Sequence, residues 1–228
     1  MIIKTDEEYD SIVKSSKLAD DCYSYIKELI KEGMTEIEIA KAMDDYMLSH
    51  GATALSFETI VGSGPNSGLI HSTPTDRKIE FGDIIQLDFG CVVNGYCSDC
   101  SRVLFVGEVK EEYKKIYDIV YEAQIEGIKN TKVGMPVCEV DAISRNIIKD
   151  KGYDFKHAVG HGVGKEVHDE PTISPKNDKD VIEDNMVFTI EPGIYFEGEF
   201  GIRIEDTCIM KDGVVIPLNN TPKEIVII

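Results

Sequence analysis

The chain has 228 residues, and its 42 acidic side chains outnumber its 24 basic ones, which gives a formal net charge of −18. Such a chain repels the phosphates of nucleic acids and the anionic surfaces of membranes, so neither is an expected partner. No apolar run approaches the roughly 20 residues that a membrane span needs, and residues 1–10 carry no basic-then-apolar export signal. We therefore expect a globular protein of the cytoplasm.

Six cysteines do not change this expectation. Cys97 and Cys100 have the spacing of a zinc or redox pair, but no second pair accompanies them. Disulfide frameworks are typical of short secreted chains. We expect free thiols that are buried or half-buried.

Two helices are predicted at the start of the chain. Thr5-Asp-Glu-Glu8 forms a capping box before an amphipathic run, and Gly33 is a natural stop. Thr35-Glu-Ile-Glu38 is a second capping box, whose helix runs to Gly51.

The hydrophobic period then changes to two, and afterwards the same order of elements recurs. Strands are predicted over residues 54–61, 84–93 and 96–106, the last two joined by a tight turn at Asn94-Gly95. Helices follow over residues 111–128 and 137–151, and strands over 155–159, 186–196 and 201–210, with an apolar tail at 225–228. Two helices followed by a β ribbon, twice over, indicate an α+β fold with antiparallel pairing. We expect one domain over residues 1–228, with halves of about 1–108 and 109–228.

Each half places two acids on its predicted hairpin. These are Asp88 and Asp99 in the first half, and Glu191 and Glu205 in the second. A carboxylate between apolar strand residues is costly to bury unless it is paired or binds a cation. A single such acid can simply face solvent, but four acids in matched positions of a duplicated fold favour convergence on one site.

Four of the five histidines lie in short segments that contain glycine or proline: His71, His157, His161 and His168. The fifth, His50, precedes Gly51 and is interpreted as a polar helix end. Glycines on either side of His161 allow the backbone to approach a ligand or a metal site closely. Any one of these histidines could be structural, but together with the four acids they indicate a site.

Four carboxylates and one neutral imidazole carry a formal charge of −4, which two divalent ions would neutralise. Oxygen-rich ligation with a single nitrogen favours a harder ion such as manganese over the cysteine and histidine sets of structural zinc. The chemistry of such a two-metal site is hydrolysis.

These residues belong to longer motifs that cover nearly the whole chain: Leu87-Asp-Phe-Gly90, Tyr96-Cys-Ser-Asp99 with Arg102, Gly160-His-Gly-Val-Gly164, Val167-His-Asp-Glu-Pro171, Glu191-Pro-Gly-Ile-Tyr195 and Gly201-Ile-Arg-Ile-Glu-Asp206. In them the chain resembles the catalytic domain of the pita-bread metallopeptidases, which include methionine aminopeptidase, aminopeptidase P, prolidase and the metal-free creatinase. The resemblance implies a pseudo-two-fold duplicated fold, with a curved antiparallel sheet covered by helices. It also implies that two metal ions are held by five ligands: Asp88, Asp99, His161, Glu191 and Glu205, with Asp99 and Glu205 among the bridging groups.

Within this family, three features resemble the Xaa-Pro peptidases more than methionine aminopeptidase. They are the Tyr96-Cys-Ser-Asp99 sequence, His157 four residues before His161, and Arg203 two residues before Glu205. Arg203 is expected on the same strand face as Glu205, where it would contact substrate or form a salt bridge to another acid of the site.

The resemblance implies attack of an activated water on the carbonyl of an Xaa-Pro bond. Glu191 is then the proton shuttle as well as a ligand, and His168 hydrogen-bonds the carbonyl oxygen as its charge develops. His71 and His157 shape the proline side of the pocket. We thus assign Glu191, His168 and His71 to catalysis, and His71, His157, His168 and Arg203 to substrate binding.

Several alternatives stay open. Methionine aminopeptidase is the second enzyme reading, because its size matches this chain, and a non-catalytic peptide-binding protein of the same fold is a third. Xaa-Pro enzymes usually carry an additional amino-terminal domain, which we expect to be absent here, the chain being either a catalytic fragment or a naturally short member. Aminopeptidase and dipeptidase activity are therefore not separated. The resemblance suggests manganese, with cobalt or zinc as alternatives, a proline-containing peptide as substrate, and a homodimer as one oligomeric state.

Overall fold

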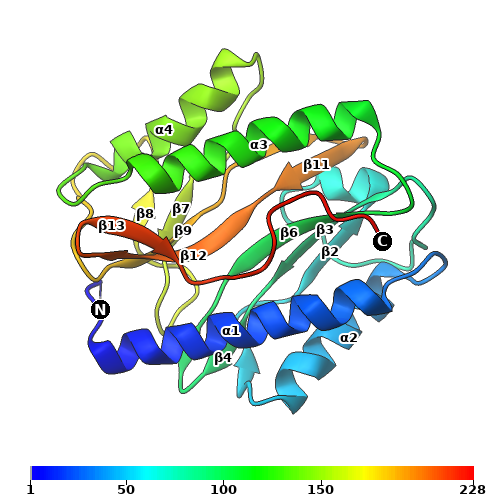
Figure 1. Cartoon of the computed structure of the whole chain (residues 1–228), viewed down its shortest axis with the longest axis horizontal. Helices are drawn as coiled ribbons and strands as arrows, with labels where there is room; N and C mark the ends of the chain where they lie inside the picture. Colours follow the sequence, from blue (N-terminus) through cyan, green and yellow to red (C-terminus); the bar gives the residue numbers. More distant parts are fainter. Residues whose placement is uncertain (1) are drawn as a thin grey trace.

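The computed structural model describes residues 2–228 (Figure 1). The first half contains α1 (Asp6–Leu29), α2 (Glu36–Ser49), β1 (Ala54–Leu55), β2 (Ile60–Ser63), the 3-10 turn η1 (Gly64–Gly68), β3 (Ile84–Phe89), β4 (Cys91–Val93), β5 (Tyr96–Cys97) and β6 (Cys100–Phe105). The second half contains α3 (Glu111–Asn130), α4 (Val137–Asp150), β7 (Gly160–Gly162), β8 (Asp169–Ile173), β9 (Val187–Ile190), β10 (Gly193–Phe196), β11 (Phe200–Arg203), β12 (Glu205–Lys211) and β13 (Val214–Pro217).

One large antiparallel sheet joins the two halves. Its strand order is β2-β3-β6-β12-β9-β7-β8, and β13 pairs with β12. Strands β6 and β12 are neighbours at the centre, where Ser101 pairs with Glu205 and Cys100 with Asp206. The last strand of the first half therefore lies against a strand of the second half. This confirms the predicted α+β class and antiparallel pairing.

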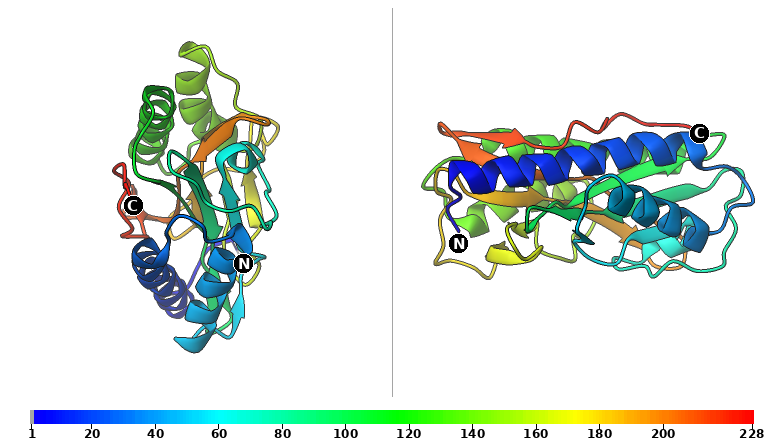
Figure 2. Two further views of the ribbon diagram at one scale, coloured as in Figure 1. Left: turned by 90° about the vertical axis from the view of Figure 1, so that its right-hand side faces the viewer. Right: turned by 90° about the horizontal axis from the view of Figure 1, so that it is seen from below.

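The helices cover one face of this sheet. Both predicted capping boxes are present, because Thr5 and Thr35 each exchange hydrogen bonds with the glutamate three residues later. Helices α1 and α3 lie along the same face, and the C-terminal segment runs between them (Figures 1 and 2). That segment is held by the Tyr117 hydroxyl, which donates to the carbonyl of Lys223 at 2.7 Å.

The hydrophobic core lies between the helices and the sheet in two main clusters. One joins α1 and α2 to apolar residues of the first-half strands, and the other joins α3 and α4 mainly to the second-half strands. On β3, Leu87 and Phe89 enter the first cluster. Since alternate strand residues point to opposite faces, Asp88 faces away from the helices. The helix-free face of the sheet is thus available for polar side chains.

The predicted strand over residues 155–159 is wrong. This segment is irregular, because the carbonyls of Phe155 and His157 accept hydrogen bonds from the Arg145 guanidinium instead of from a neighbouring strand. Strands β7, β8 and β13 were not predicted. Five predicted long strands are each divided in two: residues 54–61, 84–93, 96–106, 186–196 and 201–210.

The cysteine prediction is confirmed, because all six thiols are free, five of them buried and Cys138 half-buried. Within residues 2–228, no helix combines the length and the apolar composition that crossing a lipid bilayer requires.

Candidate metal centre

The register of three central strands places two of the predicted ligands on one face. Asp88 on β3 pairs with Ser101 on β6, and Ser101 in turn pairs with Glu205 on β12. Residues opposite one another in a sheet share a face. The Ser101 hydroxyl donates to Glu205 Oε2 at 2.7 Å. Asp88 and Glu205, one from each half of the chain, therefore lie on either side of Ser101. We call the boundary between β6 and β12, where the two halves meet, the seam.

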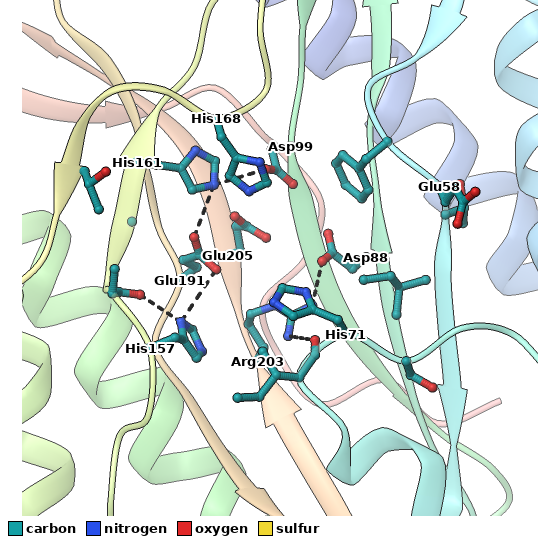
Figure 3. Close-up of a pocket in the computed structure, with 18 of the residues that line it drawn as sticks. Glu58, His71, Asp88, Asp99, His157, His161, His168, Glu191, Arg203 and Glu205 are labelled. Carbon is teal, nitrogen blue, oxygen red and sulfur yellow. Dashed lines mark hydrogen bonds and ion pairs between the residues drawn. The ribbon is translucent and has the colours of Figure 1, made fainter.

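The other three predicted ligands lie around this pair (Figure 3). Asp99 directly precedes β6, His161 is the middle residue of β7, and Glu191 follows the end of β9. His161 Nε2 lies 3.3 Å from Glu191 Oε1 and 3.5 Å from Asp99 Oδ2. Its Nδ1 lies 3.1 Å from the carbonyl of Gly162, which orients the ring.

A compact ligand group results. Asp99, His161 and Glu205 each offer one ligand atom, and these atoms all lie within 4.8 Å of one another. The glycines beside His161 play a different part from the expected one. A Cβ at Gly160 would collide with the carbonyl of Thr189, and one at Gly162 with that of Glu170. These glycines thus allow neighbouring backbones to pack, rather than approach of a ligand.

The electrostatics of the group are those of a site that needs a cation. Burial raises the pKa of Asp99 and of Glu205 well above the usual range, and charges on Asp88 and Glu191 raise both further. Burial also opposes ionisation of Glu191, but the hydrogen bond and charge of His161 outweigh it and lower the pKa of Glu191 to about 2. Four acids in one buried place repel one another when no positive ion is bound.

One oxygen of the group has no partner among the described residues. Asp88 Oδ1 is buried without a hydrogen bond, whereas its Oδ2 accepts a hydrogen bond from Arg203 Nη2 at 2.6 Å. An unpartnered buried carboxylate oxygen in a cavity lined by other carboxylates fits a divalent cation with oxygen ligands. The residues therefore suit the metal that the sequence implies.

Arg203 is buried and has several fixed partners. Its guanidinium donates to Asp88, to the Ser101 hydroxyl at 2.8 Å and to the Tyr195 hydroxyl at 2.8 Å. The salt bridge that the sequence offered as an alternative to substrate contact is thus present. Arg203 also lines the central cavity, so both interpretations agree with its position.

A cavity of about 570 Å³ opens over the acids, a size suited to a small ligand. Its wall includes the three remaining predicted histidines, His71, His157 and His168. Burial lowers the pKa of His157 and of His168, so each imidazole is neutral near pH 7. His157 Nε2 contacts the Tyr195 hydroxyl at 3.0 Å, and the His168 ring packs edge-on against His161 at 4.4 Å.

Sequence reasoning missed some residues of the site. Tyr195 bridges His157 and Arg203, and Ser101 bridges Arg203 and Glu205. Tyr195 ends a motif already noted, so its presence there was a signal. Ser101 gave none, because its role depends on strand register. Glu58, at the rim of the cavity, was also missed (Figure 3).

Comparison with known proteins agrees with this geometry. The model of metallopeptidase family M24 matches residues 10–212. The chain belongs to this family. The metallopeptidase is 42% identical over 226 residues to the Xaa-Pro dipeptidase of Pyrococcus furiosus, covering 98% of this chain and 65% of that one. It is 40% identical over 229 residues to an uncharacterized peptidase of Bacillus subtilis, covering 100% of this chain and 65% of the relative.

Solved structures give the same picture. The X-Pro aminopeptidase of Thermotoga maritima superposes with a TM-score of 0.97 at 39% identity, covering 100% of this metallopeptidase and 65% of that chain. The prolidase of Pyrococcus furiosus superposes with a TM-score of 0.94 at 42% identity, covering 97% and 66%. The chain thus spans about 65% of the length of the curated relatives it matches, and its pita-bread fold is confirmed.

Proposed function

We propose that this metallopeptidase hydrolyses the Xaa-Pro bond at the amino terminus of a peptide or in an Xaa-Pro dipeptide. The observation that carries the proposal is one cavity lined by the five acidic and histidine ligands together with His71, His157, His168 and Arg203. The relatives named as Xaa-Pro dipeptidase and X-Pro aminopeptidase support it.

Asp88, Asp99, His161, Glu191 and Glu205 would hold two divalent ions, manganese being the first choice and cobalt or zinc the alternatives. Four carboxylates and one imidazole supply the hard oxygen-rich set that manganese accepts. Bound ions supply Lewis acidity toward the scissile carbonyl and a positive field that favours a nucleophile at neutral pH.

Two side chains of the cavity are assigned the proton transfer and the stabilisation of the carbonyl oxygen. Glu191 accepts a proton from the attacking water, since its carboxylate lines the cavity beside His161. His168 is neutral and, from its place in the cavity wall, donates a hydrogen bond to the carbonyl oxygen as negative charge develops there. A neutral donor suits this step because it does not repel the bound cations.

The proline side of the substrate is assigned to the opposite part of the cavity. His71 and His157 bracket the ring, and Arg203 fixes Tyr195, which contacts His157. The Nε2 atom of His157 is occupied by that hydroxyl, so its contribution to the proline pocket is mainly shape. His71 carries no such restraint among the described residues and is the more accessible of the two.

Peptide cleavage with a panel of three substrates tests the proposal. An Ala-Pro dipeptide, an Ala-Pro-Ala tripeptide and a Met-Ala-Ala tripeptide are incubated with the manganese-loaded protein, with and without a chelator. Chelator-sensitive release of alanine before proline supports the proposal, and the ratio of the first two rates names the subclass. Release of methionine alone identifies a methionine aminopeptidase. A protein that binds metal but cleaves none of the three is a binding member of the family or needs further chain.

Two further expectations belong to the proposal. A homodimer is to be tested by light scattering, and a cytoplasmic location by cell fractionation. Both come from the resemblance to the family and from the acidic composition.

A further inference from the structure

Two histidines of the cavity wall stand on irregular backbone. His71 lies between η1, which ends at Gly68, and β3, which begins at Ile84. His157 lies between the end of α4 at Asp150 and the start of β7 at Gly160. Neither segment is fixed by a strand ladder at its histidine. The position of each imidazole therefore depends on what else holds its backbone.

A fully buried acid holds the His71 segment at both ends. Glu36, the first residue of α2, is 0% exposed. Its Oε1 accepts from the amide and the hydroxyl of Ser63, each at 2.7 Å. Its Oε2 accepts from the amide of Thr75 at 2.9 Å and from the Thr75 hydroxyl at 2.7 Å. The Asn66 amide donates to both oxygens, at 3.0 and 3.1 Å.

These donors lie on both sides of His71 in the sequence. The backbone of α2 adds two bonds, from Glu36 N to the carbonyl of Arg77 at 3.1 Å and from Ile37 N to that of Thr75 at 3.2 Å. Between these anchors, Arg203 Nη1 donates to the carbonyl of Ile70 at 3.1 Å. The segment is thus closed by Glu36 and tied to the site next to His71.

In the second half, a buried acid on α4 holds the segment that carries His157, as Glu36 holds the segment that carries His71. Asp141 is 0% exposed, and its Oδ1 accepts from the amide of Val159 at 3.0 Å. The same carboxylate holds Arg145, at 2.5 Å from Nε and 2.9 Å from Nη2. Arg145 Nη2 then donates to the carbonyl of His157 at 2.7 Å. The guanidinium also lies over the Phe155 ring, 4.5 Å from its centroid.

We propose that Glu36 and Asp141 are paired positioning residues, each of which sets the histidine that its own half contributes to the proline side of the cavity. Each acid lies on the second helix of its half, so the duplication extends to the support of the site. Neither touches the cavity. Their action passes through backbone bonds to the segments that carry His71 and His157.

The chemistry of the acids makes the proposal testable with single substitutions. A carboxylate only accepts hydrogen bonds, whereas the amide of glutamine or asparagine also donates. In Glu36→Gln, an NH₂ group would face donors from Ser63, Thr75 or Asn66 and would displace part of the segment. Asp141→Asn would do the same to the Arg145 contact. Asp45→Asn and Glu139→Gln change exposed acids on the same two helices and serve as matched controls.

The first experiment is imidazole NMR of the zinc-loaded protein, whose five histidines are assigned by single His→Gln variants. Glu36→Gln should shift or broaden the His71 signals and leave the His157 signals unchanged. Asp141→Asn should shift or broaden the His157 signals and leave the His71 signals unchanged. Thr75→Val removes one donor to Glu36 and should move His71 in the same sense, which tests the proposal even if Glu36→Gln does not fold. Unchanged signals in both acid variants, or equal changes at both histidines in each, would overturn it.

The second experiment is kinetic and rests on the proposed function. Each acid variant should raise KM for an Ala-Pro substrate about tenfold, because a displaced histidine loses binding free energy equal to about one hydrogen bond. The kcat should fall less than tenfold, and the metal content should not change. The controls should match wild type. If wild type cleaves no proline peptide, the proposed function fails, yet the NMR result still decides the positioning role. Reduced metal content in step with activity would instead make both acids structural supports of the ligands.

Discussion

Arg203 Nη2 lies 2.6 Å from Oδ2 of Asp88, and the other oxygen of that carboxylate has no partner among the described residues. The pair holds one oxygen of the carboxylate and leaves the other buried without a partner. Arg203 therefore shapes the proposed ligand set without being part of it, because it determines which oxygen of Asp88 is available.

Replacement of this arginine should weaken metal binding and stability together. Arg203→Met leaves the buried Asp88 carboxylate without the guanidinium that pairs with it, and breaking such a pair costs about 3–5 kcal/mol. Chemical denaturation of the metal-free variant measures this loss, and calorimetric metal titration measures the affinity. Wild-type affinity in Arg203→Met would show that Asp88 is oriented by other contacts.

Removal of one acid should stabilise the protein without metal. In Glu205→Gln, a neutral amide replaces a carboxyl that is costly to ionise in this buried place, so the melting temperature of the metal-free form should rise above that of wild type. Saturating manganese should stabilise wild type by about 2.7 kcal/mol at a hundredfold excess over Kd, but should not stabilise Glu205→Gln. Thermal melts with and without chelator check both effects. A metal-induced rise that survives in Glu205→Gln argues against this ligand.

His168 should matter for turnover and not for metal content. Its ring contacts His161 but forms no hydrogen bond to the acids among the described residues. His168→Ala is therefore expected to lower kcat by about 10²- to 10³-fold, as for loss of one oxyanion donor, with the metal content unchanged. Metal analysis beside the cleavage assay gives the comparison. Parallel loss of metal and activity would assign His168 a structural role.

The other arginine of the motifs, Arg102, has a structural role. Its Nη2 lies 2.6 Å from Asp206 Oδ1, and the two side chains are 1% and 0% exposed. The same guanidinium donates to the carbonyls of Thr221 and Pro222 at 3.0 and 3.1 Å. Arg102→Met should thus lower the free energy of unfolding by about 3–5 kcal/mol. Urea denaturation measures this, and an unchanged midpoint contradicts it.

A pH dependence is expected at the start of α1. Hydrogen bonds from the Thr5 amide and the Tyr96 hydroxyl lower the pKa of Glu8. Because the folded pKa lies below the unfolded one, the stabilisation is complete above the unfolded value and is lost as the pH falls through the folded value. Glu8→Gln should cost about 0.5 kcal/mol near neutral pH, since the group is partly exposed, and less near pH 4. Paired urea melts at the two pH values test this. An equal cost at both would exclude the charge as the cause.

Local signals predicted the helices well. Capping boxes and glycine stops lie next to the elements they bound, so α1 and α2 begin where Thr5 and Thr35 indicate. Local patterns also predicted that two helices followed by a β ribbon occur twice along the chain. The five ligand positions came from motifs, and the structure brings all five to one cavity.

Non-local contacts explain what the sequence left open. The partner of Arg203 could not be chosen, because Asp88 lies 115 residues away and meets it only through strand register. The irregular path of residues 155–159 follows from Arg145 on α4, which a two-residue hydrophobic period does not reveal. The support of the site by Glu36 and Asp141 was likewise invisible, since a buried acid on a helix looks like a surface acid in sequence.

The seam between β6 and β12 has a consequence for how the protein folds. Ser101 and Glu205, which meet there, are 104 residues apart along the chain. Closing so long a loop is slow, and its entropy is lost before the contacts form. Each half can collapse around its own helices, but ligands from both halves come together only when the seam closes. The candidate metal centre is thus assembled late in folding, and a bound ion would stabilise only those chains in which the two halves have paired in the correct register.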